Sequence, residues 1–148
     1  MKRTFALLFV TGICVAAAKA GDVKVDVVMT TSPNGEPTTS FTAEAPKLFA
    51  LFKTKGATNG DKARGVLIAD DVGDAAPANT KVFETSLTLD GDTEDGDFNF
   101  SKPINGWPVG KYHVEIYVND ELATKVNFTI RAAKVKKSQE QGEEESGD

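Results

Sequence analysis

The residue types that most often perform catalysis are scarce in this chain of 148 residues. It has one histidine, His113, and one cysteine, Cys14, which lies in an N-terminal segment that we expect to be removed. The mature protein therefore has no Cys-His pair and no histidine-rich zinc site. His113 follows Tyr112 at a polar position, which is typical of a solvent-facing histidine on a strand. No Gly-x-Ser-x-Gly segment occurs, so we predict no catalytic residues, and an enzyme is only a remote alternative.

One segment is rich enough in carboxylates to suggest a cation site. It contains Asp90, Asp92, Glu94, Asp95 and Asp97. Ca²⁺ takes six to eight oxygen ligands, and a loop of this composition offers several. An EF-hand loop needs glycine at its sixth position, however, and Gly96 comes one residue too late when the loop starts at Asp90. A solvated hairpin turn is therefore the preferred interpretation, a calcium-dependent binder is a remote alternative, and we assign no metal ligands and no cofactor.

Trp107 is the one tryptophan, and it precedes a turn. Pro108 and Gly110 suit the second and last positions of that turn. The indole either closes one end of a hydrophobic core or forms an exposed platform on which a sugar or a peptide stacks. Tyr117 joins such a platform only if both rings reach the same face. The core is the preferred interpretation.

The alternation of apolar and polar residues between Phe98 and Ile130 predicts successive β-strands. Two runs of apolar residues face the same side, and four residues between them, 119–122, have turn chemistry. The apolar residues are Tyr112, Val114, Ile116 and Val118 in the first run, and Val126, Phe128 and Ile130 in the second. These segments predict a hairpin with one buried face.

Earlier segments also alternate and are separated by Gly, Pro, Asn and Asp turns. We expect strands near residues 23–27, 38–42, 64–69, 83–89 and 98–100, with long loops at 55–63 and 70–80. Residues 46–54 are apolar on both faces, so they form a central strand covered on both sides, a strand feeding a bulge, or a single helical turn. No segment has a long helical repeat. Seven to eight short strands predict an all-β, antiparallel sandwich of the immunoglobulin type.

The segment from Gly106 to Tyr112 resembles the region before the penultimate strand of secreted bacterial immunoglobulin-like and fibronectin type III-like domains. In that pattern a Pro-x-Gly turn feeds a strand of the form Tyr-x-Val-x-Ile, and a returning strand ends in apolar-x-Phe-x-apolar. The matching residues here are Pro108, Gly110, Tyr112, Val114, Ile116, Val126, Phe128 and Ile130. The resemblance covers about the last quarter of the chain and implies a fold rather than a function. The cysteine pair of antibody-type domains is missing.

The N-terminus has the pattern of a cleavable secretory signal peptide. A basic start is followed by the apolar residues 5–17 and by Ala18-Lys19-Ala20, so we expect residues 1–20 to be removed after Ala20. The apolar run is too short to span a bilayer. Lipid attachment at Cys14 is disfavoured because Ile13 stands where a small residue is required. We therefore expect a periplasmic or extracellular protein without membrane insertion after cleavage.

Composition divides the remaining chain into one domain and one tail. Residues 21–131 suit a single immunoglobulin-like sandwich domain. Residues 132–148 have no large apolar residue after Val135 and are expected to be a disordered acidic tail. Removing the signal peptide leaves 14 basic and 22 acidic residues, a net charge of −8. This charge argues against nucleic-acid binding and against adhesion to anionic lipids.

These features predict an exported, non-catalytic module of the bacterial envelope. A secreted domain without disulfides must be stabilised by burial alone, which is more typical of bacterial than of eukaryotic extracellular modules. The expected partner is an unidentified protein or polysaccharide, bound by loops at one end of the sandwich or by an exposed sheet face. The alternative is a structural or assembly subunit whose edge strand pairs with a strand of its partner.

Overall fold

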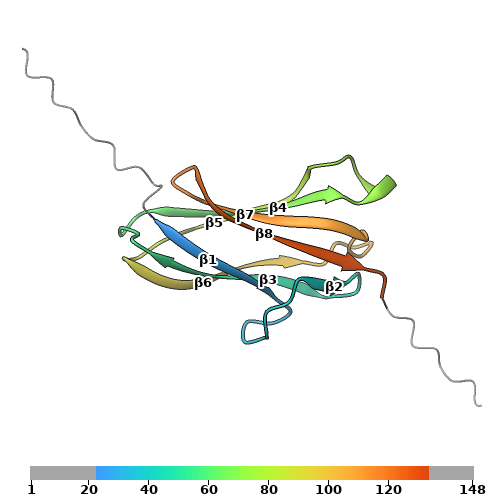
Figure 1. Ribbon diagram of the computed structural model, residues 1–148, viewed down its shortest axis with the longest axis horizontal. Coiled ribbons are helices and arrows are strands. Elements are labelled where there is room, and N and C mark those ends of the chain that lie inside the picture. The colour runs from blue at the N-terminus through green and yellow to red at the C-terminus, as the bar shows by residue number, and fades with distance from the viewer. Residues whose placement is uncertain (1–22, 134–148) are drawn as a thin grey trace, which may run out of the picture.

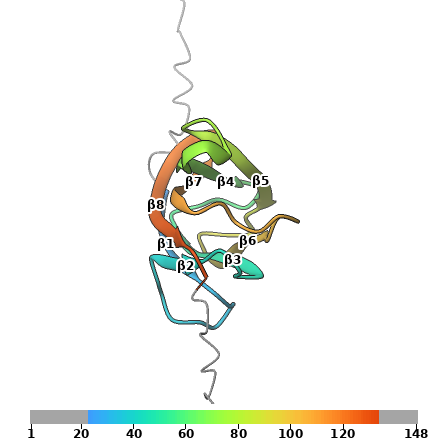
Figure 2. The same ribbon diagram turned by 90° about the vertical axis from the view of Figure 1, so that its right-hand side faces the viewer.

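The computed structural model describes residues 23–133, which fold into two β-sheets packed face to face (Figure 1). The smaller sheet has the strand order β1 (Lys24–Thr30), β3 (Lys47–Lys55), β6 (Thr93–Ser101). The larger sheet has the order β2 (Ser40–Thr42), β8 (Glu121–Arg131), β7 (Gly110–Val118), β4 (Lys62–Asp71), β5 (Thr80–Thr88). A short 3₁₀ turn, η2 (Gly73–Ala75), lies between β4 and β5. Figure 2 looks along the strands and shows the two layers.

Every neighbouring pair of strands is antiparallel except β2 and β8, which run parallel. The chain leaves the smaller sheet after β1 and joins the larger sheet as β2, at the edge of β8. The eight strands of residues 23–133 therefore form an antiparallel immunoglobulin-like β-sandwich. The fold class predicted from the sequence is confirmed.

The predicted hairpin is the pair β7 and β8. Tyr112 lies opposite Phe128, and their rings stack with centroids 5.4 Å apart. The turn contains only Asn119 and Asp120, which have φ angles of 49° and 67°. These left-handed angles are the ones that a two-residue hairpin turn requires, and Asn and Asp tolerate them. The prediction of a four-residue turn was therefore too long, since β8 already begins at Glu121.

Residues 47–55 form β3, the central strand of the smaller sheet, so the helical alternative is wrong. Leu48, Ala50 and Phe52 are buried between the sheets. Phe49 and Leu51 point to the other side of the strand, where they are half-buried. Pairing with both neighbours is regular, which also excludes the bulge. The strand is central, as expected, but its outer side is only partly covered.

The segment from Asp90 to Asp97 is not one turn, because β6 begins at Thr93. Asp95 lies opposite Lys53 in the neighbouring strand, and their charged groups are 3.6 Å apart. A cross-strand pair of opposite charges stabilises a sheet modestly. The pairing with β3 thus overrides the turn composition of these residues.

The two loops predicted from the sequence are shorter in the structure. The loop expected at 55–63 is reduced to residues 56–61, and the loop expected at 70–80 is reduced to 72–79. The predicted signal peptide, residues 1–20, and all but the first two residues of the predicted tail, 132–148, lie outside the described residues. Among residues 23–133 no helix is long and apolar enough to cross a membrane.

Candidate functional site

Trp107 is part of the core rather than a binding platform. Its side chain is 2% exposed, and its indole N–H donates a hydrogen bond of 2.8 Å to the carbonyl oxygen of Ala45. Its ring packs edge-on against Phe83, with centroids 6.1 Å apart. Tyr117 lies on the outer face of the larger sheet, where its hydroxyl donates to Glu115. The two rings therefore do not form a shared surface, and the core interpretation is confirmed.

Tyr112 stabilises the C-terminal end of the loop 102–109, which contains Trp107. Its ring is 1% exposed, and its hydroxyl donates a hydrogen bond to the carbonyl oxygen of Pro108. A buried tyrosine that bonds back to the chain just before it is typical of immunoglobulin-like sandwiches. Burial raises the pKa of Tyr112 to about 12. The residue thus contributes to stability as a neutral phenol.

We expect stability to fall as the pH rises from about 10 to about 12, because the unfolded chain loses the Tyr112 proton first. Tyr112 contributes fully to the free energy of unfolding below the pKa that it has in the unfolded chain. This contribution is lost as the pH rises through the higher pKa that Tyr112 has in the folded protein. Urea unfolding at pH 8, 10 and 11.5, compared between wild type and Tyr112→Phe, measures it. At pH 8 the free energy of unfolding of the variant should be lower by about 1 kcal/mol. Above pH 10 it should fall less steeply with pH than that of the wild type. Parallel profiles for the two proteins would contradict this assignment.

His113 lies on the outer face of the larger sheet but is only 9% exposed, so the prediction of a solvent-facing histidine was wrong. Its Nδ1 is 2.6 Å from a carboxylate oxygen of Asp70, and its Nε2 is 2.9 Å from one of Glu115. Hydrogen bonds from the Tyr117 hydroxyl and from His113 hold the pKa of Glu115 below its usual value. Both ring nitrogens thus contact carboxylates, and neither contacts the serine, threonine or cysteine that a catalytic triad pairs with its histidine.

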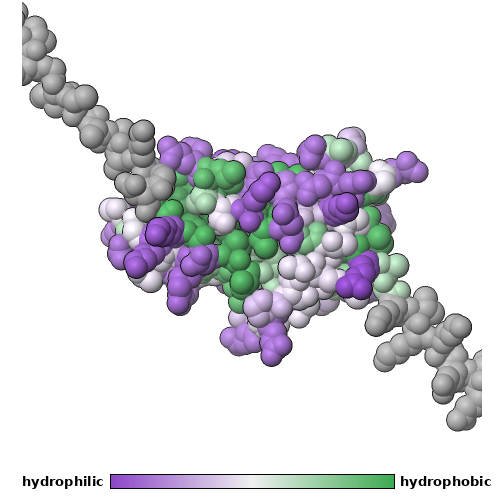
Figure 3. All heavy atoms as spheres, viewed as in Figure 1, coloured by the Kyte–Doolittle hydropathy of each residue, from purple (hydrophilic) through white to green (hydrophobic). Residues whose placement is uncertain are grey.

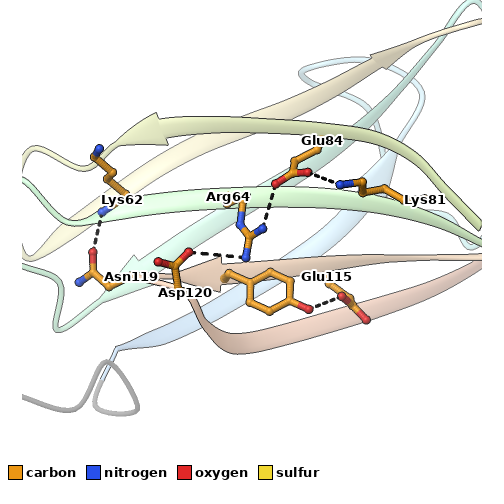
Figure 4. A network of polar contacts seen from close by, with 8 residues as sticks. Lys62, Arg64, Lys81, Glu84, Glu115, Asn119 and Asp120 are labelled. Carbon is orange, nitrogen blue, oxygen red and sulfur yellow. Dashed lines mark hydrogen bonds and ion pairs between the residues drawn. The ribbon is translucent and has the colours of Figure 1, made fainter.

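Arg64 extends these polar contacts across β4 and β5 (Figure 4). Its guanidinium lies 4.5 Å above the centre of the Tyr117 ring and forms ion pairs with Glu84, at 2.9 Å, and Asp120, at 3.6 Å. Lys81 also binds Glu84, at 2.7 Å. Hydrogen bonds from Lys81 and Arg64 lower the pKa of Glu84 to about 2. The charged groups of these four residues therefore largely pair with one another.

A β-bulge in β5 allows Lys81 and Glu84 to contact each other. Residues three apart on a regular strand point to opposite faces. Ile68 pairs with Lys81 while Leu67 pairs with Phe83, so Val82 is an extra residue in β5. The extra residue brings both charged side chains to the outer face.

The acidic residues between 90 and 97 do not converge on a cation. Glu94 accepts a hydrogen bond from the backbone of Asp90, Asp95 pairs with Lys53, and Asp97 accepts one from Asn99. Asp95 and Asp97 share one face of β6, whereas Glu94 points to the other. Within residues 23–133 no group of three or more metal-binding side chains occurs.

An apolar groove runs between β1 and β8, where the edges of the two sheets face each other. It has a volume of about 510 Å³ and is lined by Val27, Val28, Met29, Pro37, Thr38, Thr39 and Val126. Figure 3 shows the apolar residues in the middle of the face formed by β1 and β8. Val28 is 40% exposed, although it is a large apolar side chain. We call this feature the β1–β8 groove.

The upper wall of the β1–β8 groove is an edge of β8 that lacks a partner strand over part of its length. The amide of Thr129 donates to Thr39, at 2.9 Å, and the carbonyl of Arg131 accepts from Ala43, at 2.8 Å. Backbone groups of alternate residues point to the same edge of a strand. The N–H and C=O groups of Lys125 and Asn127 therefore point to this edge too, where no described residue pairs with them.

The sequence analysis missed this groove. The signal for it was the run Val27-Val28-Met29, in which one apolar residue breaks the alternation of β1. The facing edge of β8 has no comparable signal, because the position of β2 depends on the fold. The two loops expected to bind a partner are short, and the groove lies outside both.

Comparisons with known proteins support the fold but do not assign the chain to a family. No protein-family model matches the sequence, and no curated protein matches it. The chain is similar to part of the Pseudomonas fluorescens alkylpurine DNA glycosylase AlkC, in a structure bound to DNA containing an abasic site analogue. The two are 17% identical with a TM-score of 0.52, over 74% of this chain and 30% of the glycosylase chain.

A second similar structure is an immunoglobulin-like protein from Pseudomonas aeruginosa. It is 13% identical, with a TM-score of 0.40, over 74% of this chain and 91% of that chain. The chain therefore spans less than a third of the glycosylase and most of the immunoglobulin-like protein. At these identities a likeness concerns the fold alone. The class that the fold defines is an immunoglobulin-like β-sandwich.

Proposed function

We propose that the protein is an exported, non-catalytic module of the bacterial envelope that binds a protein partner in the β1–β8 groove. The observation that carries the proposal is the apolar groove itself, in which the side chain of Val28 is 40% exposed. Exposed apolar surface beside polar residues is typical of interaction sites. A polysaccharide partner is less well supported, because Trp107, the aromatic residue that suggested one, is buried.

Export and location rest on the sequence. The cleavable signal peptide predicted at residues 1–20 supports a periplasmic or extracellular site of action. The net negative charge of the mature chain argues against nucleic acid as a partner. The similarity to a DNA glycosylase does not change this argument, since it concerns the fold alone.

The function is tested by affinity capture from envelope extract with three immobilised proteins. Wild type and Ile104→Lys should retain the same protein, whereas Val28→Lys should lose it. Val28 lines the groove and Ile104 lies in the loop 102–109, yet both side chains are exposed, so neither change disturbs the core. Loss on Ile104→Lys alone would assign binding to the loops instead. Saturable glycan binding that Val28→Lys leaves intact would contradict the proposal.

A second candidate function, self-assembly, is favoured by the exposed edge of β5. Among the described residues, β5 pairs only with β4. β5 has no inward-pointing charge and no proline, and its own residue Phe83 is 36% exposed. Long edges of this kind pair readily with other strands. Sedimentation at increasing concentration distinguishes assembly from binding, with Ser86→Pro as the blocked variant, because the N–H of Ser86 points away from β4. Oligomers lost in this variant favour assembly.

A further inference from the structure

We infer that two copies of this chain pair antiparallel through β5 as a symmetric dimer, in which Thr85 lies opposite Thr85 of the second copy. The inference rests on the second candidate function, self-assembly, for which it gives the partner, the register and the size of the assembly. It does not depend on binding in the β1–β8 groove. The partner is a second copy because the edge of β5 matches itself when its direction is reversed.

β5 lies on the open side of the sandwich. The backbones of β1 and β8 approach within 8 Å at many positions, whereas those of β5 and β6 stay farther apart over most of their length. Phe83 packs against Phe100 and Trp107, which places Phe83, Thr85 and Leu87 on the inner face of β5. Thr85 is exposed all the same. The smaller sheet therefore does not cover this part of β5.

Alternate residues of β5 present their backbone groups to its free edge. The amide of Leu89 donates a hydrogen bond of 2.7 Å to the carbonyl oxygen of Asp61, the residue before β4. The odd-numbered residues after the bulge in β5 therefore bond to β4, and the even-numbered residues point away from it. The N–H and C=O groups of Glu84 and Ser86 thus have no partner strand among residues 23–133.

The direction of these groups limits how a second β5 can pair. The regular part of the strand after the bulge is residues 83–88. Hydrogen-bonded pairs join residues that both point to the free edge, so Glu84 lies opposite Glu84, Ser86 or Thr88 of the second copy. Glu84 opposite itself places like charges together, which destabilises a sheet. Glu84 opposite Thr88 leaves Phe83 without an opposite residue inside β5.

The remaining register, with Glu84 opposite Ser86, matches the side chains on both faces. On the inner face it brings Phe83 against Leu87 of the second copy, and Thr85 lies on the two-fold axis opposite itself. Aromatic–aliphatic and Thr–Thr pairs of this kind stabilise neighbouring strands. Along the edge, Glu84 and Ser86 of the second copy exchange both of their main-chain hydrogen bonds, and symmetry repeats the exchange.

Charge does not oppose this contact, although the mature chain has a net charge of −8. Glu84 is the one charged residue among residues 83–88. Its carboxylate is already paired with Arg64, at 2.9 Å, and with Lys81, at 2.7 Å. Two copies therefore meet along an edge whose charge is compensated within each copy.

The pairing closes at two copies. Each copy uses its β5 edge once, and the other edge of the larger sheet offers no matching strand, because β1 lies close beside β8 and β2 covers its end. β5 and β8 lie at opposite sides of the larger sheet (Figure 2). The dimer therefore leaves both β1–β8 grooves free, one at each of its far sides.

Cysteine crosslinking tests the register. Residues 21–148, the form expected after cleavage, contain no cysteine, so a single one can be introduced. The register sets the two Cα atoms of residue 85 about 4.5 Å apart, within reach of a disulfide, and those of residue 86 about 9 Å apart, beyond its reach. Under mild oxidation Thr85→Cys should form linked dimers about tenfold faster than Ser86→Cys.

Sedimentation measures the assembly without a crosslink. The mass of the wild type should rise with concentration to that of two chains and no further. Ser86→Pro should raise the dissociation constant of the dimer about tenfold or more, because symmetry removes two N–H donors from each dimer. Ser86→Ala keeps the N–H group and should dimerise as the wild type does. Circular dichroism checks that both variants fold.

The outcomes also separate the dimer from the proposed function. Faster crosslinking of Ser86→Cys, growth beyond two copies, or a monomer at millimolar concentration would each overturn the inference. Val28→Lys changes the groove and not the β5 edge, so it should dimerise as the wild type does. A monomer that still captures its partner would overturn the dimer alone, and a dimer that captures nothing would overturn the proposed function alone.

Discussion

Replacement of Trp107 by alanine is expected to lower the free energy of unfolding by about 3–5 kcal/mol. The indole is 2% exposed and fills the space between Phe83 and the chain at Ala45. Its removal leaves a cavity that the two sheets cannot close, and it also leaves the Ala45 carbonyl without its donor. Urea unfolding followed by circular dichroism measures the change, because the variant has no tryptophan to report fluorescence.

A matched variant separates the two contributions. Trp107→Phe retains most of the volume but lacks the N–H group, so it should cost about 1–3 kcal/mol. In the wild type, the fluorescence of Trp107 should be blue-shifted and resistant to an aqueous quencher. A quenchable indole, together with a loss below about 1 kcal/mol in Trp107→Ala, would contradict the buried position.

Gly110→Ala is expected to destabilise the protein by about 3 kcal/mol, near the upper end of what overpacking usually costs. A Cβ atom at this position would overlap the carbonyl oxygen of Asp71 and press on the Cα of Val72. Both atoms belong to the backbone, which cannot rotate aside as a side chain does. Gly110 opens β7 beside the end of β4, so the overlap would push apart two central strands of the larger sheet.

Gly91→Ala is the matched control for this change. No atom lies within 4 Å of the Cβ that it would add, so stability should stay within about 0.5 kcal/mol of the wild type. Chemical unfolding of both variants gives the comparison. Equal stabilities of Gly110→Ala and Gly91→Ala would show that the two strands separate more easily than their packing suggests.

The features that local patterns specify could be predicted from the sequence. The β7–β8 hairpin follows from period-two alternation, and its reversal follows from the tolerance of Asn119 and Asp120 for left-handed angles. The burial of Trp107 follows from its place beside a turn at the end of a predicted strand. In each case the determining residues are neighbours in the chain.

The features that depend on strand pairing could not be predicted. His113 is covered because β4 brings Asp70 beside it, 43 residues earlier in the chain. Asp95 belongs to a strand because Lys53 lies opposite it in β3. The groove exists because β2 is only three residues long, so that among residues 23–133 one edge of β8 has a paired strand along only part of its length. The alternation of apolar and polar residues does not show which strand edges lie next to each other in the fold.

The parallel pairing of β2 with β8 affects how the domain bears mechanical load. β1 begins at one end of the sandwich, and β8 ends at the other (Figure 1). Tension applied between the first and last strands therefore acts along the strand axes, so the bonds joining β2 to β8, and those joining β1 to β3, are sheared together rather than unzipped one after another.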